Sequence, residues 1–368
     1  MKLAVMGRSL RGHMSGVVRY THELVTALAA RMPDDVTVFV TRADDGLDDV
    51  PVHRIRAPFR TRTEYARAAW EQSVVPFEVS RLAPAVYHSP NYILPLALRC
   101  PTVVTVHDLA FLDSSLHRMR SHLYLSALTT LAVRKADRVI CVSRHTHDQL
   151  VERFPAVAGR ARIVTEGVGR SFTPRPPEDV ERFRARHGLP DRYILFVGTF
   201  EPRKNLARLV DAFEKAVRST GAPDVLVLCG GAGWKNDDVF ARIERSPVRS
   251  RIRVLGYLPD DELAAAYTGC SLFVYPSLSE GFGLPPVEAM ACGAPVVTSD
   301  AGALPETVGN AALLVDPSAT DAISDAMIRI LSDDQLRAQL VVSGAAHART
   351  LSWDAVAAQT IEIYQEIA

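Results

Sequence analysis

Two carboxylates, Glu280 and Glu288, bracket a glycine-containing loop, with seven residues between them. A carboxylate accepts several hydrogen bonds, which suits a pair of sugar hydroxyls. The intervening Gly281 and Gly283 let a ligand approach the main chain closely. In the structural alternative, Glu288 in the first turn of a helix complements the helix dipole, and Glu280 is solvated. The pattern therefore predicts either a sugar-binding loop or an ordinary helix start.

Two adjacent cations, Arg203 and Lys204, stand between the apolar run 193–197 and a helix expected over 207–217. A guanidinium binds two oxygens at once and an ammonium acts as a point charge, so the pair suits a diphosphate. Asn205 is expected to cap the helix. The alternative is a pair of surface charges beside a helix cap.

Polar side chains also follow two apolar runs nearer the start of the chain. His107 and Asp108 end the run 102–107, and His88, Asn91 and Tyr92 lie at or just after the run 85–89. Ligands bind outside the carboxyl ends of the strands in an open parallel sheet, so these residues are candidates for a binding cleft. A satisfied core histidine and a turn-forming Pro-Asn pair are the alternatives.

The elements that must position these residues alternate along the chain. Expected strands are 3–6, 36–40, 52–55, 85–89, 102–107, 138–143 and 163–166, then 193–197, 225–229, 253–256, 272–275, 295–298 and 313–317. Expected helices include 17–30, 70–82, 207–217 and 353–367. The alternation in two halves predicts an α/β fold with two Rossmann-like, doubly wound parallel-sheet domains facing a central cleft. The proline-rich stretch around Pro174 marks a linker between domains 1–173 and 178–350.

Composition bounds the class of protein. The chain has 368 residues, enough for two domains, and 48% apolar and 23% charged residues, as in soluble globular proteins. A net charge of zero gives no support for a nucleic-acid binder. Five widely spaced cysteines favour buried free thiols in a reducing cytoplasm. No apolar run approaches the ~20 residues of a membrane span, and the start MKLAVMG is too short for a signal peptide.

Three motifs together resemble one enzyme family. The stretch EGFGLPPVE, with its two spaced glutamates, resembles the signature of the retaining GT-B glycosyltransferases of family four, or group 1. GTFEPRKNL resembles the family's Arg-Lys element and TVHDLAFL its His-Asp element, and the likeness covers nearly the whole chain. It implies a GT-B fold in which the terminal segment 353–368 crosses back onto the first domain.

The resemblance also implies roles for individual residues. In the family, Glu280 would hold hydroxyls of the donor sugar, Glu288 the nucleotide ribose and the backbone of Leu258 the base. Gly16 would meet the donor diphosphate, and His107 would contact the sugar near its 6-position. The implied donor-binding set is Gly16, Arg203, Lys204, Leu258, Glu280, Gly281, Phe282, Gly283, Leu284 and Glu288. The expected catalytic residues are His107, Arg203, Lys204 and Glu280, and the acceptor candidates are His88, Asn91 and Tyr92.

We expect a retaining transfer of a hexose from a nucleotide sugar to a hydroxyl acceptor, in polysaccharide, glycolipid or glycosylated-metabolite biosynthesis. No two aspartates stand at i, i+2, so we expect no metal or cofactor. We expect Arg203, Lys204 and helix N-termini to stabilise the negative charge of the leaving diphosphate instead. The pattern from Glu71-Gln72 through HSPNYILP and TVHDL resembles mannosyltransferases, so GDP-mannose is the expected donor. The alternative is a non-catalytic nucleotide-sugar binding partner of a glycosyltransferase complex.

The expected location is the cytoplasm. An arginine-rich segment, 54–67, is either a solvated surface or a patch for an anionic acceptor or for peripheral association with a membrane.

A phosphorylase with the GT-B fold is a further alternative. It would need a lysine for pyridoxal phosphate, and no lysine follows Lys235.

Overall fold

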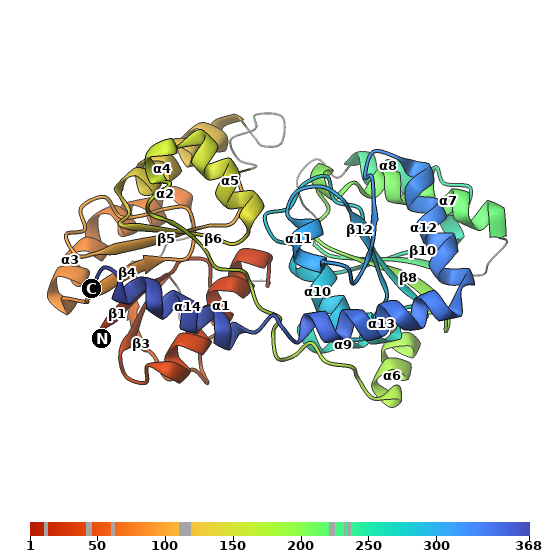
Figure 1. Ribbon diagram of the computed structural model, residues 1–368, viewed down its shortest axis with the longest axis horizontal. Helices are drawn as coiled ribbons and strands as arrows, with labels where there is room; N and C mark the ends of the chain where they lie inside the picture. Colours follow the sequence, from red (N-terminus) through yellow and green to blue (C-terminus); the bar gives the residue numbers. More distant parts are fainter. Residues whose placement is uncertain are drawn as a thin grey trace. The chain divides into compact units, whose positions relative to one another are not determined.

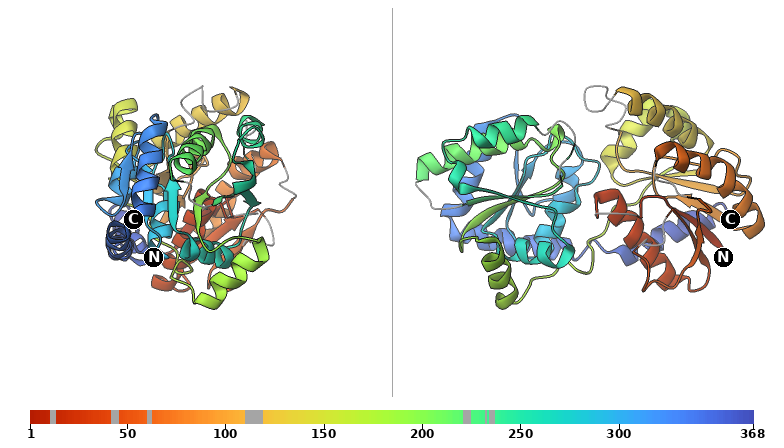
Figure 2. Two further views of the ribbon diagram at one scale, coloured as in Figure 1. Left: turned by 90° about the vertical axis from the view of Figure 1, so that its right-hand side faces the viewer. Right: turned by 180° about the vertical axis from the view of Figure 1, so that it is seen from behind.

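The computed structural model describes residues 1–10, 14–41, 46–59, 63–109, 119–220, 225–231, 233 and 237–368. The chain forms two compact units, Met1–Gly167 with Ser352–Ala368, and Val168–Leu351. The chain thus leaves the first unit after Gly167, and the proline-rich stretch that follows belongs to the second unit. In each unit helices cover both faces of a parallel sheet (Figure 1, Figure 2).

The first unit is built on a seven-stranded parallel sheet in the order β3-β2-β1-β4-β5-β6-β7. Its strands are β1 (Leu3–Gly7), β2 (Val36–Val40), β3 (His53–Arg56), β4 (Val86–Ser89), β5 (Thr102–Val106), β6 (Arg138–Cys141) and β7 (Ala161–Ile163). Its helices are α1 (Gly16–Arg31), α2 (Glu64–Ala69), the π-helical turn η1 (Trp70–Val74), α3 (Val75–Leu82), α4 (Met119–Lys135), α5 (Arg144–Arg153), the 3-10 turn η3 (Pro155–Val157) and α14 (Trp353–Gln365). Leu3 in β1 pairs with Val36 in β2 and with Val86 in β4, so the strand order reverses at β1.

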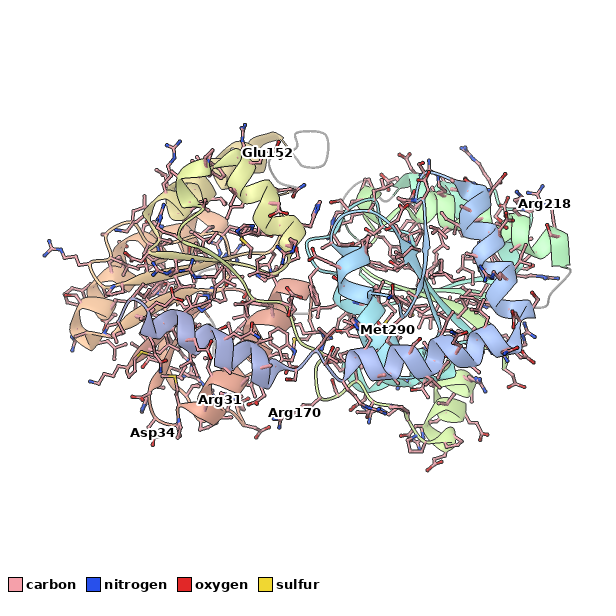
Figure 3. The ribbon with its side chains drawn as sticks, in the orientation of Figure 1. Arg31, Asp34, Glu152, Arg170, Arg218 and Met290 are labelled. Carbon is pink, nitrogen blue, oxygen red and sulfur yellow. The ribbon has the colours of Figure 1, made fainter. Side chains whose placement is uncertain are left out.

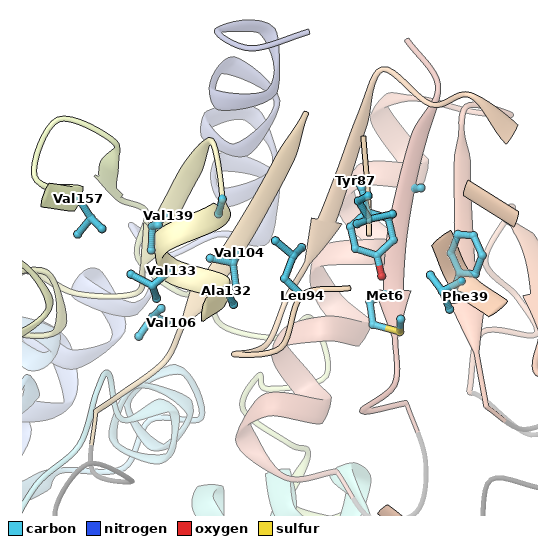
Figure 4. Packing of buried hydrophobic residues seen from close by; sticks show 14 of the residues in the cluster. Met6, Phe39, Tyr87, Leu94, Val104, Val106, Ala132, Val133, Val139 and Val157 are labelled. Carbon is cyan, nitrogen blue, oxygen red and sulfur yellow. The ribbon is translucent and has the colours of Figure 1, made fainter. Parts of the chain in front are cut away.

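The strands β1, β2 and β5 of the first unit are short, fully buried and largely apolar, as expected where helices cover a sheet on both sides. A buried cluster that includes Met6, Phe39, Tyr87 and Val104 packs on one side (Figure 4). The terminal helix α14 lies beside α1 (Figure 1). Arg31, labelled in Figure 3, donates from Nη2 to a carboxylate oxygen of Asp354 at 2.7 Å at the end of α1.

The second unit holds a six-stranded parallel sheet in the order β10-β9-β8-β11-β12-β13. Its strands are β8 (Tyr193–Val197), β9 (Val225–Cys229), β10 (Ile252–Gly256), β11 (Leu272–Tyr275), β12 (Val296–Ser299) and β13 (Leu313–Val315). Its helices are α6 (Pro177–His187), α7 (Leu206–Thr220), α8 (Asp237–Glu244), α9 (Asp260–Gly269), α10 (Leu284–Ala291), α11 (Leu304–Val308), α12 (Thr320–Ser332) and α13 (Asp334–Ala348), with 3-10 turns η4 (Pro202–Lys204) and η5 (Arg249–Arg251). The order reverses at β8, which pairs with both β9 and β11.

Helices α7, α8 and α12 cover one face of the second sheet, and α9, α10 and α13 cover the other (Figure 1). Gly344 of α13 lets that helix pack directly on Met290 of α10, since a Cβ there would lie 3.1 Å from its side chain (Figure 3). Ligands bind outside the carboxyl ends of the strands where the strand order of such a sheet reverses. The loops after β8 and β11 in this unit, and after β1 and β4 in the first, are therefore the places to look for a site.

Some local expectations need correction. The strand expected at 163–166 is β7, Ala161–Ile163, so Glu166 lies beyond its end. The helix expected at 70–82 is a π-helical turn, Trp70–Val74, followed by α3. Helix α1 begins at Gly16 rather than at Val17.

All five cysteines are free, and four of them, Cys141, Cys229, Cys270 and Cys292, are buried as expected. Cys100 is half-buried. In the part of the chain that the structure describes, no helix combines the length and apolarity needed to cross a membrane.

Candidate active site

The loop after β8 carries its two cations in the 3-10 turn η4, just before α7. The next residue, Asn205, has a left-handed backbone (φ 61°), and its amide donates to the carbonyls of Pro276 (3.0 Å) and Pro317 (2.7 Å). Asn205 therefore ties the loops after β11 and β13 to this turn. The expectation that it caps α7 was wrong. An N-cap residue has an extended backbone, and its side chain accepts from a backbone N–H of the helix. Here Oδ1 accepts from the side-chain Nη1 of Arg208 at 2.9 Å.

The carboxylate of Glu280 lies at the centre of a compact cluster of donors. Arg203 Nη1 donates to Oε2 at 2.5 Å, and Lys204 Nζ donates to Oε1 at 2.5 Å. Oε1 also accepts from the hydroxyl of Tyr275 at 2.9 Å and from Ser277 Oγ at 2.6 Å. Glu280 is 8% exposed and Lys204 6%, whereas the Arg203 side chain is 25% exposed. Burial of Lys204 and its contact with Glu280 rule out the surface-charge interpretation for this residue.

These contacts set the ionisation of the cluster. Burial alone would raise the pKa of Glu280, but Arg203, Lys204 and the Ser277 hydroxyl outweigh it and hold that pKa at about 2. Burial lowers the pKa of Lys204, and Glu280 opposes this effect. Burial and the Glu280 charge raise the pKa of the Tyr275 phenol well above its usual value. At neutral pH the cluster thus holds an ionised carboxylate and a neutral phenol.

The backbone of Glu280 is fixed by the loop after β12. Ala303 N–H donates to the Glu280 carbonyl at 3.0 Å. Gly302 has a left-handed backbone (φ 63°), and a Cβ there would lie 2.8 Å from both the nitrogen and the oxygen of Glu280. Only glycine fits this close approach without displacing the main chain. The loop after β12 therefore holds the backbone of Glu280, and the turn after β8 contacts its carboxylate.

In the first unit, His107 follows β5 and is almost fully buried. Its Nε2–H donates to the Pro90 carbonyl at 2.9 Å, and Nδ1 lies 3.2 Å from an oxygen of Glu166. Burial by itself would lower the pKa of His107, but Glu166 and the Pro90 carbonyl raise it above its ordinary value. An imidazolium donates from both nitrogens, so these two acceptors favour the charged ring. The Tyr20 ring packs edge-on against it with centroids 4.6 Å apart.

His88 lies in the core of the same unit and has no exposed surface. Its Nδ1 is 2.6 Å from the Tyr364 hydroxyl of α14, and its Nε2 is 2.8 Å from Thr105 Oγ1. Thr105 Oγ1 is in turn 3.2 Å from the Tyr20 hydroxyl. Burial lowers the pKa of His88 to about 3, so the ring is neutral. This placement makes His88 part of a buried polar chain that anchors α14, where we had expected a cleft residue.

Comparisons with known protein families cover most of the chain. The profile described as Glycosyl transferases group 1 matches residues 178–346, and the one described as Glycosyltransferase Family 4 matches residues 14–172. The chain is 30% identical to the O-antigen chain mannosyltransferase B of Escherichia coli over 99% of this chain and 100% of that protein. The chain belongs to the group 1 glycosyltransferases. Further relatives are a serotype-specific mannosyltransferase WbdA of Escherichia coli (28% identity, 83% of this chain, 39% of that one) and a D-inositol 3-phosphate glycosyltransferase of Corynebacterium glutamicum strain R (31%, 73% and 67%).

Solved structures agree on the fold of this glycosyltransferase. The Anabaena protein HepE, in complex with UDP and glucose, matches with a TM-score of 0.79 over all of both chains at 21% identity. Sucrose-phosphate synthase from Thermosynechococcus elongatus matches with a TM-score of 0.79 at 25% identity, covering 100% of this chain and 98% of that one. The lipopolysaccharide glycosyltransferase WaaG has the same TM-score at 16% identity, over 98% of this chain and 99% of that one. The expected fold, GT-B with two Rossmann-like parallel-sheet domains, is confirmed.

The second glutamate of the signature lies elsewhere than expected on its helix. Helix α10 begins at Leu284, so Glu288 is past the first turn and cannot serve there as a partner for the helix dipole. Its side chain is buried, 3% exposed, and Oε2 accepts from the Tyr267 hydroxyl of α9 at 3.2 Å. Glu280 and Glu288 thus have different partners: cations and hydroxyls for the first, a tyrosine of the neighbouring helix for the second.

The loop between the glutamates is closely packed. Gly283 has φ 99°, and a Cβ there would lie 2.6 Å from the Leu304 side chain, so this glycine is required for its backbone and its space. Phe282 is buried and its carbonyl accepts from Thr307 Oγ1 at 2.7 Å. Leu284, the residue after Gly283, is the first residue of α10. Leu258 is buried in the short loop between β10 and α9.

The remaining candidates lie in the first unit. Asn91 Oδ1 accepts from the Ile93 N–H at 3.3 Å, as a turn-forming residue does. Tyr92 packs its ring edge-on against His107, with centroids 5.9 Å apart. Gly16 is the exposed first residue of α1, and a Cβ at this position would meet no described atom within 4 Å. Part of the glycine loop before it, and part of the arginine-rich segment, lie outside the described residues.

Side-chain partners of the predicted charged residues, among them Glu166, Tyr275 and Ser277, were not predicted. Glu166 ends an expected strand, as His107 does, but its pairing with His107 is a contact between distant segments. Tyr275 and Ser277 flank Pro276 immediately before the glycine loop. Among the residues that the structure describes, no three His, Cys, Asp or Glu side chains come together as a metal site would require.

Proposed function

We propose that this glycosyltransferase transfers mannose from GDP-mannose to a hydroxyl acceptor, with retention of configuration and without a metal ion. The observation that carries the proposal is the cluster of Arg203, Lys204 and Glu280 at the point where the strand order of the second sheet reverses. The choice of mannose is supported by relatives that are mannosyltransferases, one of them similar over its full length.

Glycosyl transfer passes through an oxocarbenium-like state, and negative charge develops on the departing diphosphate. Arg203 and Lys204 would bind that diphosphate and stabilise it increasingly as the glycosidic bond breaks. The guanidinium is the more exposed of the two and offers paired donors, whereas the buried ammonium contributes a fixed charge. Together the guanidinium and the ammonium would perform the task that a divalent ion performs in other transferases.

The other residues would complete the donor site. Glu280 would hold hydroxyls of the sugar, Glu288 the ribose and the backbone at Leu258 the base; Gly16 would meet the diphosphate. His107, held by Glu166 and Pro90 through both ring nitrogens, would act through its position and its charge, because neither nitrogen can reach a sugar without releasing a partner. Asn91 and Tyr92 remain the acceptor-side candidates; fully buried His88 would support them from within the core.

The test begins with the purified full chain and a thermal-shift panel of GDP-mannose, UDP-glucose, dTDP-glucose and ADP-glucose. GDP-mannose should raise the melting temperature most and should be hydrolysed slowly in the absence of acceptor. Nuclear magnetic resonance of the released sugar or of a glycoside product should show the anomeric configuration of the donor. A larger shift with another base, or an inverted product, would contradict the donor or the stereochemistry; binding without any turnover would favour a non-catalytic role.

A further inference from the structure

The two oxygens of the Glu280 carboxylate have partners of different kinds. Oε1 accepts from two hydroxyls, Tyr275 (2.9 Å) and Ser277 (2.6 Å), and from the Lys204 ammonium (2.5 Å). Oε2 accepts from the Arg203 guanidinium (2.5 Å). An anion that drew both cations away would therefore leave Oε1 its two neutral hydroxyl partners, whereas Oε2 would lose its guanidinium partner.

The cations of the cluster already have carboxylate partners. Arg203 contacts Glu280 through Nη1 and Glu201 through Nε, the latter at 2.7 Å, and Lys204 contacts Glu280. Two positive charges are therefore matched by two negative ones. A diphosphate that binds Arg203 and Lys204 must compete with Glu280 for them, because both cations are within hydrogen-bond distance of that one carboxylate.

The hydroxyl of Tyr275 cannot follow the cations. Its ring is stacked against Phe196 of β8 with centroids 5.7 Å apart and against Phe273 of its own strand at 6.0 Å. Tyr275 is 1% exposed and Ser277 fully buried. Burial keeps the phenol protonated by raising its pKa, so it remains a donor to Oε1.

We propose that Glu280 is an internal counter-ion which the diphosphate of the donor replaces, while Tyr275 and Ser277 act as positioning residues that keep Oε1 in place. On binding, Arg203 would turn from Oε2 to a phosphate oxygen, and the vacated Oε2 would accept from a hydroxyl of the sugar. This inference rests on the proposed function. It means that the carboxylate becomes available to the sugar only when the diphosphate is present.

The first test measures affinity for inorganic pyrophosphate and for GDP by calorimetry at low ionic strength. Glu280→Gln keeps the shape of the side chain but removes the competing charge. It should therefore bind both ligands at least about tenfold more tightly than the wild type, although its turnover falls. Asp321→Asn is the matched control, since it removes a carboxylate paired with Lys215 at 2.6 Å in the same unit and should leave both affinities unchanged.

The outcomes separate the inference from the proposed function. If the wild type binds GDP and Glu280→Gln binds it equally or more weakly while retaining the wild-type melting curve, the counter-ion inference is wrong and the proposed function stands. If neither protein binds any nucleoside diphosphate, the proposed function fails, and the inference with it.

The second test covers the case in which Glu280→Gln does not fold. Tyr275→Phe keeps the stacked ring and removes the donor to Oε1. It should bind pyrophosphate no more weakly than the wild type but should lose about tenfold in kcat with saturating donor, and Ser277→Ala should behave similarly. A merely structural role would lower the melting temperature without this split between affinity and kcat; an unchanged kcat in Tyr275→Phe would overturn the positioning role.

Discussion

Each unit of this glycosyltransferase buries an ion pair beyond the carboxyl ends of its strands, and the two pairs are built differently. In the second unit, Glu280 faces a guanidinium, Arg203, and an ammonium, Lys204. In the first, Glu166 faces a histidine, His107, whose charge depends on pH. The second unit thus pairs its carboxylate with side chains whose ordinary pKa is high, whereas the first unit pairs its carboxylate with an imidazole, which titrates nearer neutrality.

The two pairs should therefore fail at opposite ends of the pH scale. The pKa of Glu280 is lowered from 4.5 to about 2, so its contribution to stability is complete above pH 4.5 and is lost as the pH falls toward 2. The pKa of His107 is raised above 6.5, so its contribution is complete below pH 6.5 and is lost as the pH rises through the raised value.

The largest expected effect follows removal of the cations that face Glu280. Arg203→Ala and Lys204→Ala should each lower kcat by about 100- to 1,000-fold, the cost of losing one donor at a site where anionic charge develops. Lys204→Ala should also lower the melting temperature, because it leaves a buried carboxylate with one cation fewer. Arg203→Lys should recover activity only in part, since it loses the paired geometry.

Steady-state kinetics with saturating donor, beside a melting curve, measures both quantities. Arg218→Ala and Lys215→Ala are matched controls on α7, where the cations are more exposed and pair with Glu214 and Asp321. Near-normal kcat in Arg203→Ala would return that residue to an ordinary surface charge.

The pair in the first unit should show a smaller, pH-dependent effect. Glu166→Gln should lower the free energy of unfolding by an amount on the order of 1–3 kcal/mol below pH 6.5, since the imidazolium loses its charged partner. The difference from the wild type should shrink as the pH rises through the raised pKa of His107, where the ring becomes neutral in both proteins. Melting curves from pH 5 to pH 9 measure it, and a gap that stays constant across this range would show that His107 is not charged.

The buried chain that includes His88 should matter for stability alone. Tyr364→Phe removes the hydroxyl that contacts His88 Nδ1 and should cost about 1 kcal/mol of unfolding free energy. Its kcat should stay within about twofold of the wild type, because α14 holds none of the proposed catalytic groups. Urea titration and kinetics of the same sample test both statements; a tenfold loss of kcat would extend the active site into this chain.

The smallest expected effect is that of chelation. If Arg203 and Lys204 neutralise the leaving diphosphate, EDTA should leave turnover within about twofold of its untreated value. Activity that EDTA abolished and Mg²⁺ or Mn²⁺ alone restored would move the charge-stabilising role away from the two cations.

Most of the strand framework was predictable, because strands buried on both faces appear as short apolar runs between polar turns. Thus Tyr193–Val197 and Leu272–Tyr275 were predicted to the residue. Helices α12 and α13 were not predicted, although the buried residues of α12, among them Ile323, Met327 and Ile330, follow helical spacing. The π-helical turn at Trp70–Val74 has no local sequence signal that distinguishes it from the α-helix on either side.

For the site, residue type and position after a strand were sufficient to select Arg203, Lys204, Glu280 and His107. They were insufficient to find partners, because Glu166, Tyr275 and Ser277 are recognised only once distant segments meet. They also misplaced His88, since a histidine at a strand end looks the same in sequence whether it faces solvent or the core. Asn205 was misassigned for a related reason: its left-handed backbone is a property of the turn.

The first unit is completed by Ser352–Ala368, a stretch that is synthesised only after the entire second unit. Gly167 and Trp353 pack closely, since a Cβ added at Gly167 would lie only 2.5 Å from the Trp353 nitrogen. The segment that leaves the first unit and the segment that returns to it are therefore neighbours. During synthesis on the ribosome, the second unit can fold as soon as it emerges. The first must wait with the surface for α14 uncovered, and with His88 lacking its tyrosine partner, until Ser352–Ala368 has left the ribosome.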